Sequence, residues 1–369
     1  MPLIVDSHND LAWNILSFGR DYTRAAAETR RLEAGSAAVA ENGNTLLGWP
    51  DYQRGQVALV FSTLFAAPLR HRTHISETQV YETSEEAHRL YRAQLMAYQR
   101  LTDSHPDKFQ LIGSGPDLKR VLDDWRAPRP PAPDAPPGHP VGLVVLMEGG
   151  DGIRSLDELA EWHELGVRVI GPAWAGTRFC GGTREPGPLT AEGRALLAAM
   201  ADHHFFLDIS HMDEPAALEA LDRYAGPVIA THGNCLALLP DFPTNRQFSD
   251  RLIRGLIERD GALGVVPYNV FLKSGWTRAS NRRDEVHIDD LLLHIDHICQ
   301  LAGDSLHTGI GTDFDGGFGL ESVPPQIDTI ADLQNLDAML TARGYSEDDV
   351  ENILGRNWLT RLEKDLPAS

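Results

Sequence analysis

The chain has 369 residues, of which 42% are hydrophobic and 23% are charged, so it can fold around a large buried core. Its formal net charge of −20 argues against binding to nucleic acid or to an anionic membrane, because both require a basic face. Its three cysteines form neither a disulfide framework nor a zinc knuckle. We expect a cytoplasmic protein without a signal peptide or membrane span, and a homodimer is one expectation for its assembly.

Eight short apolar runs are typical of buried strands, and helical patterns lie between them. The runs cover residues 3–6, 57–64, 141–147, 167–170, 205–209, 228–230, 262–267 and 308–311. Most are continuous in Val, Ile and Leu rather than alternating, as parallel strands covered on both faces are. The helical patterns cover residues 83–100, 156–165, 190–202, 215–224, 249–259 and 289–302. This rhythm predicts an α/β fold, a (β/α)8 TIM barrel formed as a single domain over residues 1–369.

Four segments do not fit the minimal barrel. Residues 109–113 are compatible with an extra strand, and the Pro-rich stretch 127–140 predicts a stiff surface insertion. Residues 19–52 show weak periodicity, which predicts a long loop over the active-site mouth. Residues 346–363 predict a terminal helix that is capped by Ser346.

Side chains that can bind metal follow five of the eight predicted strands. They are His8 and Asp10, Glu148, His211, His232 and Asp313. In this fold the catalytic groups lie at the carboxyl ends of the strands. A single histidine at such a position is more commonly a packing or loop residue. Five strand ends that all carry such a group predict a metal site.

The ligand set predicts two ions rather than one. His8, Asp10, His211 and His232 can each supply one bond, and Glu148 can bridge through its two oxygens. Two bridged ions can share a water, make it a nucleophile near neutral pH and polarise a carbonyl. Zinc suits mixed imidazole and carboxylate ligands best, and manganese or iron would also accept them.

Two further charged side chains have predicted roles beside the ions. Asp313 would be left as the proton shuttle, although Asp-Phe-Asp-Gly is also a turn sequence. Arg246 can bind a substrate carboxylate with its planar fork, although it can equally be a surface arginine. Some binuclear barrel hydrolases bridge their two ions through a modified lysine at the end of the fourth strand. None of the four lysines in this chain ends that strand, so Glu148 is the bridging candidate. His294 and His297 lie within a helical pattern and are expected to be structural.

These residues, in this order, resemble the membrane (renal) dipeptidases, peptidase family M19, which are related to the amidohydrolases. The resemblance runs from Asp6 to about Glu363. Its motifs are Asp6-Ser7-His8-Asn9-Asp10, Met147-Glu148-Gly149-Gly150, Ile209-Ser210-His211, Thr231-His232, Asn245-Arg246 and Gly311-Thr312-Asp313-Phe314-Asp315-Gly316. It implies that His8 and Asp10 bind one zinc ion, that His211 and His232 bind the other, and that Glu148 bridges. It also implies that Arg246 holds the substrate carboxylate and that Asp313 takes part in proton transfer.

The chain departs from the family pattern in the substrate pocket. The family keeps a histidine just after the fourth strand, which helps to bind the substrate carbonyl oxygen, and Trp174 stands in this place here. Asp151 replaces another frequent histidine after Glu148-Gly149-Gly150. Trp174 can donate a hydrogen bond but cannot act as an acid or a cation. We therefore expect an intact metal site beside an altered substrate pocket, in which Trp174 contacts the substrate.

The sequence thus predicts a metallodipeptidase that cleaves the amide bond of dipeptides with a metal-bridging hydroxide, as the resemblance implies. Family members often accept a D-residue or a dehydro-residue on the C-terminal side, and some open β-lactams. Two alternatives remain: a related hydrolase or tailoring enzyme for another amide or lactam substrate, and a non-catalytic scaffold that metal stabilises.

Overall fold

The computed structural model describes residues 1–74, 77–127 and 138–368. Eight parallel strands neighbour one another in the order β11-β10-β7-β6-β2-β1-β13-β12. A parallel bridge between Ala230 and Leu263 joins the two edges, so the barrel is nearly closed. The strands are β1 (Ile4–Asn9), β2 (Val57–Phe65), β6 (Val141–Glu148), β7 (Val167–Gly171), β10 (Phe206–Asp208), β11 (Val228–Ile229), β12 (Leu263–Val265) and β13 (Thr308–Ile310). The predicted (β/α)8 TIM barrel is confirmed.

The continuous apolar runs suit barrel strands, because both faces of such a strand are buried. Every residue of β1 and of β6 is buried, with one face toward the barrel interior and the other toward the helices. The strand β1 extends beyond its apolar run to Asn9 and therefore carries His8 itself. The extra strand β5 (Phe109–Leu111) pairs with the first half of β6, where Phe109 faces Val141.

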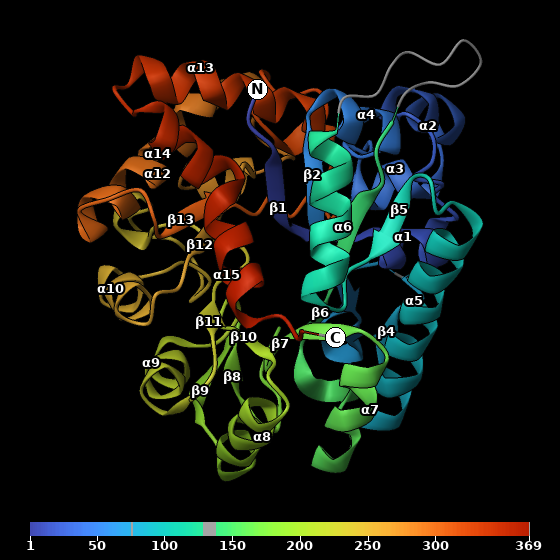
Figure 1. Cartoon of the computed structure of the whole chain (residues 1–369), viewed down its shortest axis with the longest axis vertical. Helices are drawn as coiled ribbons and strands as arrows, with labels where there is room; N and C mark the ends of the chain where they lie inside the picture. The colour runs from blue at the N-terminus through green and yellow to red at the C-terminus, as the bar shows by residue number, and fades with distance from the viewer. Residues whose placement is uncertain (75–76, 128–137, 369) are drawn as a thin grey trace.

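Helices surround the strands (Figure 1), and side chains cap several of them. Thr83 and Glu86 form a capping box at the start of α5, and Thr190 and Ser249 cap α8 and α10. The principal helices are α5 (Ser84–Ser104), α6 (Gly115–Arg126), α7 (Leu159–Glu164), α8 (Ala191–Asp202), α9 (Glu214–Arg223), α10 (Asp250–Glu258), α12 (Ile288–Ala302), α13 (Asn335–Ala342) and α15 (Asn357–Asp365). Among the described residues, none of the helices has the length and apolar character that crossing a membrane requires.

The prediction of one long loop over residues 19–52 is wrong. Three short helices lie there: α2 (Ala26–Glu33), α3 (Ala37–Asn42) and α4 (Trp49–Arg54). Helices of this length have little periodicity and depend on tertiary contacts. One such contact joins the Ala26 N–H to Asp51 Oδ2 over 2.7 Å. The predicted position at the mouth is right, because Glu41 and Asn42 line the large cavity there.

The terminal helix begins as predicted, with a capping box formed by Ser346 and Asp349. It is not one regular helix, however. A π-helical turn, Asn352–Arg356, separates α14 (Glu347–Glu351) from α15. This turn packs closely on the first strand, since a Cβ on Gly355 would lie 2.6 Å from the Leu3 carbonyl oxygen. Most of the Pro-rich insertion predicted at 127–140 lies outside the described residues.

Candidate metal-dependent active site

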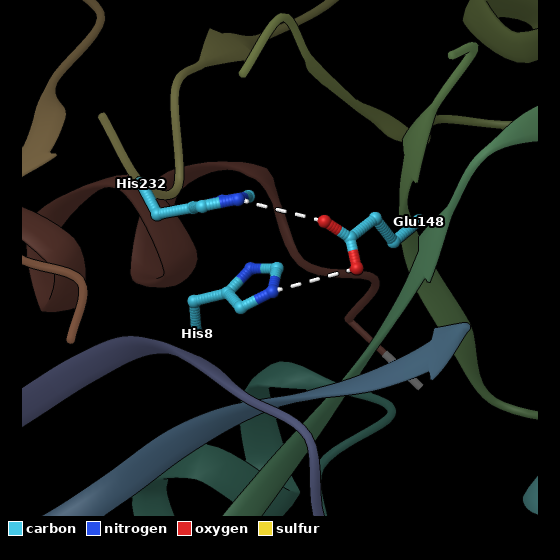
Figure 2. Close-up of side chains that lie close together, drawn as sticks. All are labelled: His8, Glu148 and His232. Atoms are coloured by element: carbon cyan, nitrogen blue, oxygen red, sulfur yellow. Dashed lines mark ion pairs between the residues drawn. The ribbon is translucent and has the colours of Figure 1, made fainter. Parts of the chain in front are cut away.

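The predicted metal ligands meet at the end of the barrel where the parallel strands terminate. His8 lies on β1, Glu148 is the last residue of β6, and His232 follows β11. Figure 2 shows the two Glu148 oxygens turned toward different imidazoles. Oε2 lies 3.6 Å from His8 Nε2, and Oε1 lies 3.5 Å from His232 Nε2. A carboxylate in this position can bridge two cations.

His211 completes the group on the Oε1 side of Glu148. Its Nε2 lies 2.9 Å from Glu148 Oε1 and 2.9 Å from His232 Nε2. Two ring nitrogens and a carboxylate oxygen therefore converge on one point. This cluster of His211, His232 and Glu148 has the donor set of one ion.

Two carboxylates lie on the other side, around His8. Asp10 Oδ2 and Asp313 Oδ1 lie 3.7 and 3.8 Å from His8 Nε2. Two groups of three residues have ligand atoms within 4.8 Å of one another. One group is His8, Glu148 and His232, and the other is His8, Asp10 and Asp313. Asp313, which we predicted to be a proton shuttle, thus also lies among possible ligand atoms.

The electrostatics of the cluster fit a bound cation. Burial raises the pKa of Asp10 to about 7 and that of Asp313 well above its usual range. Burial opposes a charge on His8 too, but Glu148, Asp10 and Asp313 outweigh it and raise the pKa of His8 to about 10. Within the described residues, the buried His8 Nε2 has no hydrogen-bond partner. A divalent ion would satisfy these carboxylates and the open nitrogen together.

The hydroxyl of Thr231 determines how two of the imidazoles present their nitrogens. It donates to Asp208 Oδ2 over 2.6 Å, so its proton is not free for another partner. Its oxygen lies 3.3 Å from His8 Nδ1 and 3.0 Å from His232 Nδ1. Both rings must then carry a proton on Nδ1 and donate it to Thr231. In the neutral ring, which is the form that binds metal, this tautomer leaves the Nε2 lone pair of each histidine directed at the site.

We expect Thr231→Val to weaken metal binding by about 10- to 100-fold, since both histidines lose the acceptor that holds their tautomer. Competition with a chromophoric chelator measures the affinity. Thr231→Ser keeps the hydroxyl and should bind metal nearly as the unmodified protein does. Equal affinities in the Val and Ser variants, both with normal melting temperatures, would show that the hydroxyl does not orient the ligands.

Two buried aspartates that sequence reasoning did not assign hold the strand ends in place. Asp6 accepts hydrogen bonds from the Thr312 N–H and hydroxyl, over 2.7 and 2.5 Å, which ties β1 to the segment before Asp313. Asp208 similarly accepts from the Ser210 hydroxyl, over 2.5 Å, and from Thr231. The sequence did carry a signal for both residues, because each is an aspartate within an apolar run. A carboxylate is rarely buried in such a run unless it accepts hydrogen bonds.

Asp315 anchors the segment that carries Asp313. Its carboxylate accepts hydrogen bonds from Arg20 over 3.0 Å, from Tyr22 over 2.8 Å and from Thr45 over 2.5 Å. The side chains of Arg20 and Asp315 are almost entirely buried. This network connects the strand end to the segments that flank the short helices of residues 19–52. Asp313 lies between Thr312, which is bonded to Asp6, and Asp315, and its φ is 57°.

We expect Asp315→Ala to lower the free energy of unfolding by about 3–5 kcal/mol, because it removes the fully buried carboxylate that pairs with Arg20 and leaves Glu33 as the carboxylate still paired with that guanidinium. Urea denaturation measures the loss. Asp315→Asn keeps an acceptor oxygen and should lose less. A loss below about 1 kcal/mol in the alanine variant would show that the buried pair is not needed for stability.

Arg246 lies directly beside the ligand histidines. Its guanidinium donates to the carbonyl oxygens of Ser210 and His232, over 2.8 and 2.9 Å, and stands 5.5 Å from the centre of the Phe271 ring. It is buried, and burial lowers its pKa. Arg246 also lines a cavity of about 410 Å³, together with Glu148, His211 and His232 of the ligand cluster. It is therefore not a surface arginine.

Trp174 lines the same cavity next to His211. Its ring centre lies 6.1 Å from that of His211 and 5.1 Å from that of Phe65. Asp151, the other departure from the family pattern, accepts a hydrogen bond from Tyr81 over 2.6 Å. His294 and His297 have structural contacts, as expected. His294 Nδ1 accepts from the Cys235 N–H, and His297 pairs with Asp250.

Comparisons with known proteins show the family of this chain. A family model described as membrane dipeptidase, peptidase family M19, matches residues 1–365. An uncharacterised protein from the pqqA 5′ region of Klebsiella pneumoniae is 29% identical over 73% of this chain and 94% of its own length. Dipeptidase tcpJ of Claviceps purpurea is 24% identical over 75% of this chain and 60% of its own length.

Solved structures share the fold. A metallo peptidase from Rhodobacter sphaeroides, liganded with a phosphinate mimic of L-Ala-D-Ala, has a TM-score of 0.77, 24% identity and 99% coverage of both chains. The probable dipeptidase PvdM from Pseudomonas aeruginosa has a TM-score of 0.77 at 16% identity and covers 99% of this chain and 95% of its own. With the whole-length match to the family model, the chain belongs to the membrane dipeptidase family M19, a family of metal-dependent hydrolases.

Proposed function

We propose that this protein is a binuclear metallodipeptidase that hydrolyses the amide bond of dipeptides, with zinc as the metal. The observation that carries the proposal is the position of Glu148 between His8 on one side and His211 and His232 on the other. In this proposal His8 and Asp10 hold one ion, and His211 and His232 hold the second. Bound ions would polarise the amide carbonyl and activate the attacking water.

Asp313 is proposed to carry the proton to the departing amine. Its Oδ1 lies 3.8 Å from His8 Nε2, so it is at the edge of the ligand cluster and also lines the cavity. Burial raises its pKa well above the usual range, and the neighbouring Asp10 and Glu148 add to that effect. A carboxyl group whose pKa is raised in this way holds a proton more readily, as a group that passes a proton to a departing amine must.

Arg246 is proposed to bind the carboxylate of the substrate. Its charge lies beside His232 at the cavity wall, and two of its five N–H groups are held by the backbone carbonyls of Ser210 and His232. The guanidinium is therefore fixed in place before substrate arrives. A fixed cation next to the ligand cluster positions a short substrate with a free C-terminus so that its amide reaches the metal ligands.

One observation favours the alternative of a different amide or lactam substrate. Trp174 places a large indole in the cavity next to His211. The ring supplies an apolar surface and one N–H donor, so it can select a substrate that is bulkier than a simple dipeptide. In that case the metal ligands would work as proposed while ordinary dipeptides would be poor substrates.

A panel of L,L and L,D dipeptides tests the proposal, with protein loaded with zinc and with protein stripped by exhaustive chelation. We expect the loaded protein to hydrolyse members of the panel, and the stripped protein to lose that activity and regain it with zinc. Full activity after exhaustive metal removal would contradict the proposal. Zinc binding without dipeptide turnover, together with cleavage of N-acyl amino acids or lactams, would favour the alternative substrate class. Metal that raises only the melting temperature would indicate a scaffold.

A further inference from the structure

Four aromatic side chains form a continuous wall on one side of the cavity, which we name the Tyr268 wall. Its members are Phe242, Tyr268, Phe271 and Phe318. Tyr268 stacks on Phe318 with ring centres 4.1 Å apart and planes at 12°, and it meets Phe271 edge-on at 5.1 Å. Phe271 in turn meets Phe242 at 5.8 Å. All four line the cavity that holds the ligand cluster.

The wall adjoins the residues proposed to bind and protonate substrate. The Arg246 guanidinium stands 5.5 Å from the centre of the Phe271 ring. Tyr268 and Asp313 line the same cavity, where burial and then the Asp313 carboxylate raise the pKa of the Tyr268 phenol to about 12. A residue whose carboxylate is held by Arg246 would therefore have the Tyr268 wall next to its side chain.

A second, separate aromatic group adjoins His211 instead. Trp174 packs against Phe65 at 5.1 Å and against His71 at 6.0 Å. The ligand cluster thus has one aromatic surface near Arg246 and another near His211. A dipeptide bound with its amide at the cluster would meet a different surface with each of its two residues.

We propose that the Tyr268 wall binds the side chain of the substrate's C-terminal residue and selects aromatic and large aliphatic side chains there. This inference rests on the proposed function, because it takes Arg246 as the carboxylate-binding group. The competing candidate is an acidic C-terminal residue, because Arg184 lines the same cavity with an exposed cationic side chain. An apolar C-terminal residue is favoured over an acidic one, because its side chain, for example a benzyl group, would be buried against the four rings of the wall.

Hydrolysis of Ala-Phe, Ala-Leu, Ala-Ala and Ala-Asp, each with a C-terminal L- or D-residue, tests the inference. We expect kcat/KM for the better Phe isomer to exceed that for the matching Ala-Ala by about 10- to 100-fold. Phe242→Ala, at the half-buried edge of the wall, and Phe318→Ala, at its buried end, should each bring this ratio closer to one. Phe65→Ala is the matched control, because it removes a ring from the other group and should leave the C-terminal Phe-to-Ala ratio unchanged.

Binding of uncleavable phosphinate pseudo-dipeptides separates this inference from the proposed function. If the zinc-loaded protein cleaves no dipeptide yet binds the C-terminal Phe phosphinate at least tenfold more tightly than the Ala phosphinate, the proposed function fails and the wall's selectivity stands. If dipeptides are cleaved but Ala-Phe is no better than Ala-Ala, or Ala-Asp is best, the inference is overturned while the proposed function survives. An unchanged Phe-to-Ala ratio in both Phe242→Ala and Phe318→Ala would also overturn it.

Discussion

Replacing Glu148 with glutamine should lower dipeptide hydrolysis by about 1000-fold or more, because the bridging position loses its charge and one of its two oxygens. In the unmodified protein the two oxygens face His8 on one side and His211 and His232 on the other. An amide can offer only its oxygen to one side and would turn N–H donors toward ring nitrogens on the other. Metal content per chain, measured by elemental analysis, should fall with the activity.

Glu161→Gln provides the matched control for this variant. Glu161 makes an exposed ion pair with Arg92 over 2.7 Å and does not line the cavity, so the same change there should leave both activity and metal content unaltered. Retention of two ions and of most activity in Glu148→Gln would exclude a bridging role. Circular dichroism of both variants establishes whether the barrel is intact.

Replacing Asp313 with asparagine should lower kcat by about 100- to 10,000-fold and leave two ions bound. Asparagine has nearly the same shape but cannot carry a proton, so the chemical step loses its proton carrier. The structure also offers a different outcome, because Asp313 Oδ1 lies among the ligand atoms around His8. Kinetics with parallel metal analysis distinguish the two roles. Loss of an ion in proportion to activity would make Asp313 a ligand rather than a proton carrier.

The sequence was sufficient to predict the barrel and the residues that meet at its mouth. Buried parallel strands are continuous apolar runs, and all eight were recognisable for that reason. Because parallel strands end at one rim, residues as distant in the chain as His8 and His232 could be expected to lie together. Their ring centres are in fact 3.7 Å apart.

Features that depend on tertiary contacts were not predictable in the same way. The helices α2, α3 and α4 are too short to show periodicity and depend partly on contacts such as that between Arg20 and Asp315. The roles of Thr231 and Asp208 follow only from distances between side chains, since nothing in a Thr-His pair reveals which nitrogen the hydroxyl holds. The Tyr268 wall likewise joins rings about 75 positions apart in the chain, from Phe242 to Phe318.

Titration of metal-free protein with zinc, with dipeptidase activity measured at each addition, tests the central claim most directly. The account predicts that activity rises with added zinc and reaches its plateau at two ions per chain, since it assigns one ion to His8 with Asp10 and the other to His211 with His232, with Glu148 between them. Activity that is already full before any zinc is added, or a chain that takes up no zinc at all, would contradict it.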